Sequence, residues 1–336
     1  MDPRSPRARG LRGAGVSTGR GRAWLEIMRI SNLPTVVSNA IAGAAVGAAA
    51  GWGIDGIQNG IKDWHEMPEH LLWSIAAPPL AYVAGMILND AFDARIDARE
   101  RPSRPIPSGR IRRFDAFAVG FALLALSVIA SRLSGSALAL SLTLALVGGV
   151  VLYNAVHARS AASVLLLACC RALAALIPLA AFHGQPMRWT LVTIALPAAL
   201  ALWTVALSLL ARGEADGQRG PRVAVGAVDL AVAGFFTCVA GVAILAGYLL
   251  TRTPPSLVLT GAVAALALIS SIVARRAWQR MRVDPRETPR SIGRFIACIA
   301  LVDAIFITAL GDPLTGVACI ALAALATRLQ RRIAGS

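Results

Sequence analysis

The chain has 336 residues, of which 56% are hydrophobic and only 15% are charged. Soluble globular domains carry about 25% charged residues, so the composition excludes an ordinary soluble domain. The formal net charge of +15 could indicate a nucleic-acid-binding protein, but no aromatic–basic stripe or binding motif accompanies the arginines. We therefore expect no nucleic-acid partner.

Residues 1–28 form an arginine-rich segment with few acidic residues. This composition suits an irregular cytoplasmic tail, and it also suits the n-region of a signal peptide or an organellar presequence. The segment that follows is only weakly apolar, which favours an uncleaved tail. We predict a disordered tail over residues 1–28 and one transmembrane domain over residues 29–333.

Apolar runs, many of them about 20 residues long, recur from residue 33 to the C-terminus, and this length crosses a bilayer as a helix. They cover residues 33–53, 71–93, 114–132, 136–154, 162–182, 189–211, 223–249, 255–276, 291–310 and 313–331. Pro313 should break the last pair, because proline clashes with the preceding helical turn. The pattern predicts an all-α integral membrane protein, a polytopic bundle of nine to ten transmembrane helices.

The arginines are concentrated in the first 30 residues and after every second apolar run. With ten spans, all these clusters fall on one side of the membrane, and the opposite loops are poor in arginine or acidic. Positive charge marks the cytoplasmic face. We therefore expect a multi-pass protein, of a bacterial inner membrane, with both termini in the cytoplasm.

The second apolar run ends in the sequence Asn89-Asp90-Ala91-Phe92-Asp93-Ala94-Arg95-Ile96-Asp97. At about 100° per residue, the amide and the three carboxylates fall within about 100° of one another on a helix. Three like charges on one face repel one another, and a hard divalent cation resolves that repulsion. Mg²⁺ is typically held by one or two carboxylates and by substrate phosphates. The motif predicts that Asn89, Asp90, Asp93 and Asp97 hold a magnesium-bound diphosphate near the cytoplasmic face.

The loop after this motif contains Pro102, Pro105 and Pro107, which forbid a continuous helix. Arginines on such a stiffened segment can donate forked hydrogen bonds to phosphate oxygens. We predict that Arg104 and Arg101 bind substrate phosphate. Contact with lipid headgroups is the alternative.

Two charged residues lie inside other apolar runs, where an unpaired charge is costly. The position of Arg171 favours a role in a cavity, with snorkelling to the headgroups as the alternative. Asp303 lies deep in the ninth run, where an internal hydrogen bond or a partner arginine is expected.

In these motifs the chain resembles the UbiA superfamily of intramembrane prenyltransferases. The matching pieces are residues 29–35, the N-D-x-x-D-x-x-x-D motif, the loop Arg104-Pro105-Ile106-Pro107-Ser108-Gly109, and Tyr153 at the end of the fourth run. Together they run over about half of the chain. The long form of the loop is most similar to the branch related to 4-hydroxybenzoate polyprenyltransferases.

The resemblance implies a helical bundle around a central cavity that opens to the cytoplasm and to lipid. It also implies Mg²⁺ as cofactor, a polyprenyl diphosphate as donor, and an aromatic or other lipophilic acceptor. The residues carried over as catalytic are Asp93, Asp97, Tyr153 and Arg171. Those expected to bind substrate are Asn32, Asn89, Arg101, Arg104, His157 and Arg212.

A second acidic motif departs from the family pattern. Where D-x-x-x-D is expected, the chain has Ala211-Arg212-Gly213-Glu214-Ala215-Asp216-Gly217. Glu214 and Asp216 would point about 160° apart on a continuous helix. We predict that both complete the metal site, with an ordinary polar helix end as the alternative.

Two other functions stay open. A family member that binds lipid diphosphates without catalysis is compatible with the altered second motif. A transporter would also carry intramembrane acids, but it should have broken helices at the midplane, whereas these acids gather at one face.

Overall fold

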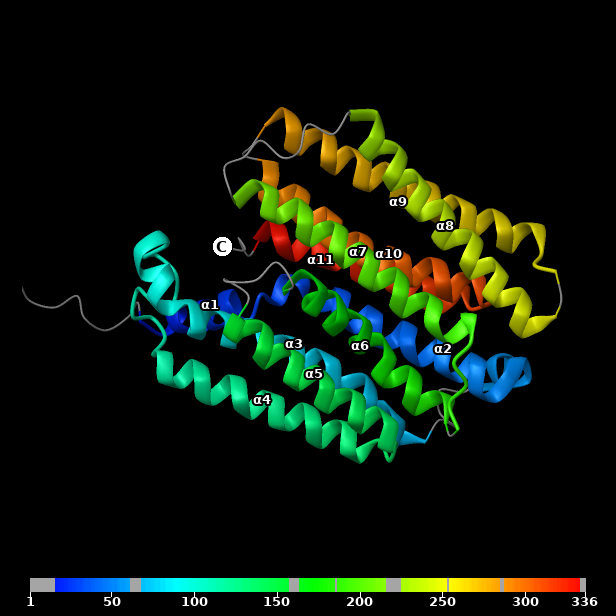
Figure 1. The fold of residues 1–336 in the computed structure, drawn as a ribbon, viewed down its shortest axis with the longest axis horizontal. Coiled ribbons are helices and arrows are strands. Elements are labelled where there is room, and N and C mark those ends of the chain that lie inside the picture. Colours follow the sequence, from blue (N-terminus) through cyan, green and yellow to red (C-terminus); the bar gives the residue numbers. More distant parts are fainter. Residues whose placement is uncertain are drawn as a thin grey trace, which may run out of the picture.

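The computed structural model describes residues 16–60, 68–156, 163–184, 186–215, 225–252, 254–284 and 287–332. The regular secondary structure in these ranges is helical (Figure 1). The elements are α1 (Val16–Ile27), the 3₁₀ helix η1 (Ile30–Asn32), α2 (Leu33–Gly60), α3 (Glu69–Glu100), α4 (Arg113–Leu133), α5 (Ala137–Val156), α6 (Ser163–His183), α7 (Leu191–Ala215), α8 (Val225–Thr251), α9 (Leu257–Val283), α10 (Thr288–Ala309) and α11 (Pro313–Arg332).

Within the described residues, ten helices are long and apolar enough to cross a membrane by length and composition. They coincide with the ten predicted runs, so the predicted fold class is confirmed. The last two spans are separate, as Pro313 predicted: α10 ends at Ala309, and α11 begins at Pro313. Gly311 between them has a positive φ of 90°, a conformation that glycine adopts without a steric cost.

The longest helix, α3, carries the acidic motif. Its 32 residues extend about 48 Å, more than the roughly 30 Å of a bilayer's hydrocarbon core. The apolar run ends near residue 93, but the helix continues to Glu100. Asn89, Asp90, Asp93 and Asp97 therefore lie on one uninterrupted helix, as their spacing predicted.

The helices run along the long axis of the molecule, and their connections gather at its two ends (Figure 1). The turns after α4, α8 and α10 lie at one end. The loop over residues 101–112, the end of α9 and the end of α11 lie at the other. We call this second end the arginine-rich end, because its basic residues include Arg101, Arg104, Arg110, Arg112, Arg280, Arg282, Arg331 and Arg332.

Helices α2 and α6 pack with their backbones in close approach. Gly43, Gly47 and Gly51 repeat every fourth residue along α2, and a Cβ at any of them would overlap the backbone of α6. Their partners on α6 are Ala175, Leu179 and His183, which have the same spacing. Small residues at this interval let membrane helices approach closely. The two helices are thereby fixed in one parallel register.

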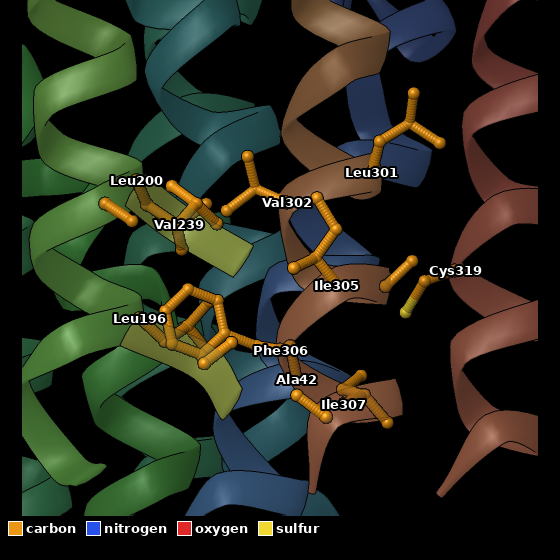
Figure 2. Close-up of a cluster of buried hydrophobic side chains, with 14 of the residues drawn as sticks. Ala42, Leu196, Leu200, Val239, Leu301, Val302, Ile305, Phe306, Ile307 and Cys319 are labelled. Atoms are coloured by element: carbon orange, nitrogen blue, oxygen red, sulfur yellow. The ribbon is translucent and has the colours of Figure 1, made fainter. Parts of the chain in front are cut away.

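The most buried of the described spans is α10, which packs against α11, α9, α2, α8 and α7. Figure 2 shows Val302 and Phe306 of α10 extending toward Leu200 and Leu196 of α7. Cys319 of α11 lies on the other side of α10. An apolar side chain on nearly every face is expected of a helix that is surrounded by other helices. A charged residue in α10 therefore requires a partner from a neighbouring helix.

Part of the predicted tail is ordered. Residues 16–27 form α1, whose Ala23 and Ile27 are buried against Ile87 of α3. Ile106 and Ile111 of the proline-containing loop join the same cluster. This apolar contact holds the loop over the end of α3. The arginine-rich composition of the segment gave no indication of it. Residues 1–15 lie outside the described part of the chain.

Candidate functional site

The acidic face of α3 is divided into two edges that have different surroundings. At about 100° per residue, Asn89 and Asp93 form one edge, and Asp97 and Asp90 form the other. Asp90 and Asp97 are each only 4% exposed, whereas Asn89 and Asp93 are half-buried. The edges therefore offer their oxygen atoms to different partners.

The buried edge faces arginines. Nη1 of Arg104 donates a hydrogen bond to Oδ2 of Asp97 at 2.7 Å and lies 3.6 Å from Oδ1 of Asp90. Nη2 of Arg29 lies 3.9 Å from the same Asp90 atom. This Oδ1 has no hydrogen-bond partner among the described residues, so electrostatic attraction alone engages it there. Charge compensation on this edge comes from the protein.

The half-buried edge lies on the same stripe of α3 as two residues that line a cavity. Nδ2 of Asn89 lies 3.4 Å from Oδ2 of Asp93, at the limit of a hydrogen bond. Residues spaced i, i+4, i+7 and i+11 share one helix face. Tyr82 and Met86, which line the cavity, have this spacing with Asn89 and Asp93. One stripe of α3 therefore leads from the cavity to the amide and carboxylate.

The cavity has a volume of about 100 Å³ and lies between α2, α3, α5 and α6. Most of its lining is apolar, with side chains such as Val36, Leu146, Val150 and Leu167. Its polar side chains are Tyr82, Tyr153, Asn154 and Arg171, of which Tyr153 and Asn154 lie in the last turn of α5. Such a cavity, apolar with a few converging polar groups, suits an elongated lipid with one polar end.

Arg171 lines this cavity and does not extend to the arginine-rich end. Its Nη1 donates a hydrogen bond to Oδ1 of Asn39 at 3.0 Å. The Tyr82 hydroxyl, on the same cavity, lies 3.4 Å from the carbonyl oxygen of Arg29. The structure thus places Arg171, Tyr153 and Tyr82 on one cavity, and the Asn89–Asp93 edge follows Met86 on the same face of α3.

The other predicted residues are distributed around this site. Asn32 accepts a hydrogen bond from Gln330 at 2.9 Å, and Arg101 is exposed at the arginine-rich end. Arg212 and Glu214 lie in the last turns of α7. His157 and Asp216 lie outside the described residues. The second acidic motif therefore stays a prediction.

The donor atoms on α3 fit magnesium only if the substrate supplies further ligands. Among the residues that the structure describes, no three His, Cys, Asp or Glu side chains could enclose a metal ion. Mg²⁺ usually keeps several waters and binds one or two carboxylates together with substrate phosphates. The amide and carboxylate oxygens of Asn89 and Asp93 provide such a partial shell. Asp90 and Asp97, predicted as ligands, lie next to it and are paired with arginines.

Several residues around the site were not singled out from the sequence. Ser38 and Asn39 precede the glycine repeat of α2, and Tyr82 lies two turns before the acidic motif. Asn154 donates a hydrogen bond to the carbonyl oxygen of Gly85 at 3.3 Å. The Gly43, Gly47 and Gly51 spacing is the signal that could have pointed to Asn39, because it predicts a helix interface one turn away.

Comparison with known proteins gives a family match and a fold match. A model of the UbiA prenyltransferase family matches residues 40–299. A UbiA homologue from Archaeoglobus fulgidus, bound to GPP and Mg²⁺, has a similar fold, with a TM-score of 0.53. The similarity covers 89% of this chain and 99% of that chain at 16% identity, so it indicates the fold alone.

Curated relatives match over a shorter range. Digeranylgeranylglyceryl phosphate synthase from Ignicoccus hospitalis is 36% identical over 112 residues, which are 33% of this chain and 31% of that protein. The enzyme of the same name from Korarchaeum cryptofilum is 42% identical over 105 residues, which are 31% and 32% of the two chains. The matched segments thus span about a third of these relatives.

Proposed function

The chain belongs to the UbiA prenyltransferase family, and on this premise we propose that it transfers a prenyl group from a prenyl diphosphate to a lipophilic acceptor within the membrane. The transfer depends on Mg²⁺. The site opens to the cytoplasm, the side indicated by the arginine-rich end.

The observation that carries this proposal is the continuous stripe of Tyr82, Met86, Asn89 and Asp93 on α3. It joins an apolar cavity to an amide and a carboxylate within one helix. A prenyl diphosphate has the same division, with an apolar chain attached to a polyanion. We propose that the chain enters the cavity and that Asn89 and Asp93 hold the magnesium of the diphosphate. The cavity is small beside the roughly 300–1,000 Å³ of drug-sized pockets. A long prenyl chain therefore extends beyond it.

The two edges of the acidic face then have separate tasks. Bound Mg²⁺ would neutralise the charge that develops on the departing diphosphate. Asp90 and Asp97 hold Arg29 and Arg104 beside this place, where guanidinium groups can donate to phosphate oxygens. Tyr153 presents an aromatic side chain to the cavity, which can stabilise an allylic cation.

The reaction replaces one C–O bond by another. The allylic carbon loses its bond to the diphosphate oxygen and gains a bond to the acceptor oxygen, while the acceptor hydroxyl releases a proton. The names of the curated relatives favour a glyceryl phosphate that already carries one prenyl ether as the acceptor. We propose this acceptor class, which is narrower than the aromatic or other lipophilic acceptor that the family resemblance implies.

The test uses the full-length protein in detergent with Mg²⁺ and prenyl diphosphates of 10, 15 and 20 carbons. We expect diphosphate release and an ether product, detected by mass spectrometry, when the monoprenyl glyceryl phosphate is present. EDTA should abolish both, and Asp93→Asn should lower both at a magnesium concentration that half-saturates the wild type. The matched control is Asp115→Asn, which removes a carboxylate at the same end that pairs with exposed Arg20.

Other outcomes would overturn parts of the proposal. Product formed only with an aromatic acceptor would overturn the glyceryl phosphate. Magnesium-dependent binding of prenyl diphosphates without release under any condition would favour the non-catalytic alternative. The absence of both binding and release would overturn the prenyltransferase function.

A further inference from the structure

Asp303 is a carboxylate in the middle of α10, the most buried span of the bundle. It is 0% exposed and lies between apolar neighbours such as Val302 and Ile305. Placing a charge in an apolar environment is costly unless it is paired or hydrogen-bonded. The contacts of Asp303 therefore need an explanation.

Two side chains of α2 donate to a single oxygen of this carboxylate. Ser38 Oγ lies 2.5 Å from Asp303 Oδ2, and Asn39 Nδ2 lies 2.7 Å from the same atom. Both donors are 0% exposed. A carboxylate oxygen thus holds two adjacent residues of α2 inside the bundle.

The network continues from Asn39 to the cavity. The amide nitrogen of Asn39 faces Asp303, so its oxygen points the other way and accepts from Arg171 at 3.0 Å. An ionised carboxylate can only accept hydrogen bonds, which fixes the orientation of the amide. With the opposite orientation, the Asn39 amide would present donors to the guanidinium. Asp303 therefore determines which face Asn39 offers to Arg171.

The backbone supports the same alignment. Asn39 lies one turn before Gly43, and Arg171 lies one turn before Ala175, where the two helices touch. The close approach of α2 and α6 therefore brings the Asn39 amide to the guanidinium. α10 packs against α2, which places Asp303 on the far side of the amide.

We propose that Asp303 is a positioning residue: through Asn39, it holds the Arg171 guanidinium at the cavity wall and compensates its charge. This role rests on the proposed prenyl transfer, since Arg171 lies with Tyr82 and Tyr153 on the cavity proposed for the prenyl diphosphate. Asp303 touches neither the cavity nor the acidic motif in the described contacts. Its effect on the reaction is transmitted by the side chain of Arg171.

The first experiment measures stability and needs no turnover. Asp303→Asn, Arg171→Gln and the double variant are compared by thermal unfolding in detergent. Each single variant leaves one charge uncompensated in the bundle, whereas the double variant removes both. We expect the double variant to lose less than the sum of the two single losses in unfolding temperature. Strictly additive losses would overturn the charge compensation.

The second experiment measures kcat and KM for magnesium-dependent diphosphate release. We expect Asp303→Asn to lower kcat by roughly 10- to 100-fold, the scale of a misplaced substrate-positioning group. In the Arg171→Gln background the same change should have no further effect on kcat. Asn39→Ser breaks the link while keeping both charges, and it should reproduce the loss if Asp303→Asn does not fold.

The matched control is Ser270→Ala on α9, which removes a hydroxyl that is 0% exposed and bonded only to its own helix in the described contacts. It should leave kcat and KM unchanged. A wild type without turnover would overturn the proposed function and, with it, the positioning role of Asp303 in the reaction. If the wild type turns over, and Asp303→Asn lowers kcat by the same factor in the wild-type and the Arg171→Gln backgrounds, only the role of Asp303 would be overturned.

Discussion

Arg104 Nη1 and Asp97 Oδ2 lie 2.7 Å apart, and the two side chains are only 5% and 6% exposed. The pair connects the proline-containing loop to the end of α3. Ile106 and Ile111 anchor the same loop in the apolar cluster below it. Asp97, the final acid of the motif, thus holds the loop in place at the end of α3.

Breaking this pair should destabilise the protein. Arg104→Gln leaves Asp97 without its arginine, and breaking a buried pair costs about 3–5 kcal/mol. Asp97→Asn should cost less than this, because Arg104 keeps Asp90 at 3.6 Å. We expect each variant to unfold earlier in detergent, and the double variant to lose less than the sum. Asp115→Asn breaks the more exposed pair with Arg20, at 3.4 Å, and should change stability by less than about 1 kcal/mol. Equal effects of Asp97→Asn and Asp115→Asn would contradict a structural role for the Arg104 pair.

A long prenyl chain should pass the far end of the cavity. Leu146 lines it two turns of α5 before Tyr153, away from the acidic face. Leu146→Trp fills part of this space, so kcat/KM for a 20-carbon diphosphate should fall at least about tenfold relative to a 10-carbon one, a loss of roughly 1.4 kcal/mol in transition-state binding. Leu144→Trp, at a site that is 52% exposed on the same helix, is the control. An unchanged ratio in Leu146→Trp would show that the chain lies elsewhere.

The contact between α2 and α6 should tolerate no added side chain. Gly47→Leu would overlap the backbone of Leu179, which only a separation of the helices can relieve. We expect a loss of about 1–3 kcal/mol or more in unfolding free energy, together with lower diphosphate release because Asn39 moves away from Arg171. Gly241→Leu on α8, where nothing lies within 4 Å of an added Cβ, should have neither effect. Normal stability of Gly47→Leu would contradict the close approach of these helices.

Most of the fold could be predicted from the sequence because membrane spans are specified locally. A run of about 20 apolar residues must form a helix to satisfy its backbone in lipid, so the length and the spacing of the runs were sufficient. The common face of Asn89 and Asp93 followed from helical periodicity in the same way. α1 was not expected, because the exposed Arg20 and Arg22 precede its buried Ala23 and Ile27 and give the segment the composition of a tail.

The arrangement within the site could not be predicted because it depends on tertiary contacts. The partition of the acidic face depends on where the loop over residues 101–112 folds back to place Arg104. The Asn39–Asp303 contact joins residues separated by 264 positions, and it depends on how α2 lies between α6 and α10. An internal hydrogen bond was expected for Asp303 and is observed, but the sequence did not identify Ser38 and Asn39 as its donors.

The most direct measurement is a magnesium titration of diphosphate release for Asp93→Asn and Asp97→Asn beside the wild type. If Asn89 and Asp93 hold the metal while Asp97 holds Arg104, Asp93→Asn should raise the half-saturating magnesium concentration about tenfold or more, a loss of roughly 1.4 kcal/mol in binding. Asp97→Asn should leave that concentration near the wild-type value while lowering stability and the maximum rate. Equal shifts of the magnesium concentration in both variants would contradict the division of the acidic face and would make Asp97 a metal ligand, as the motif alone predicted.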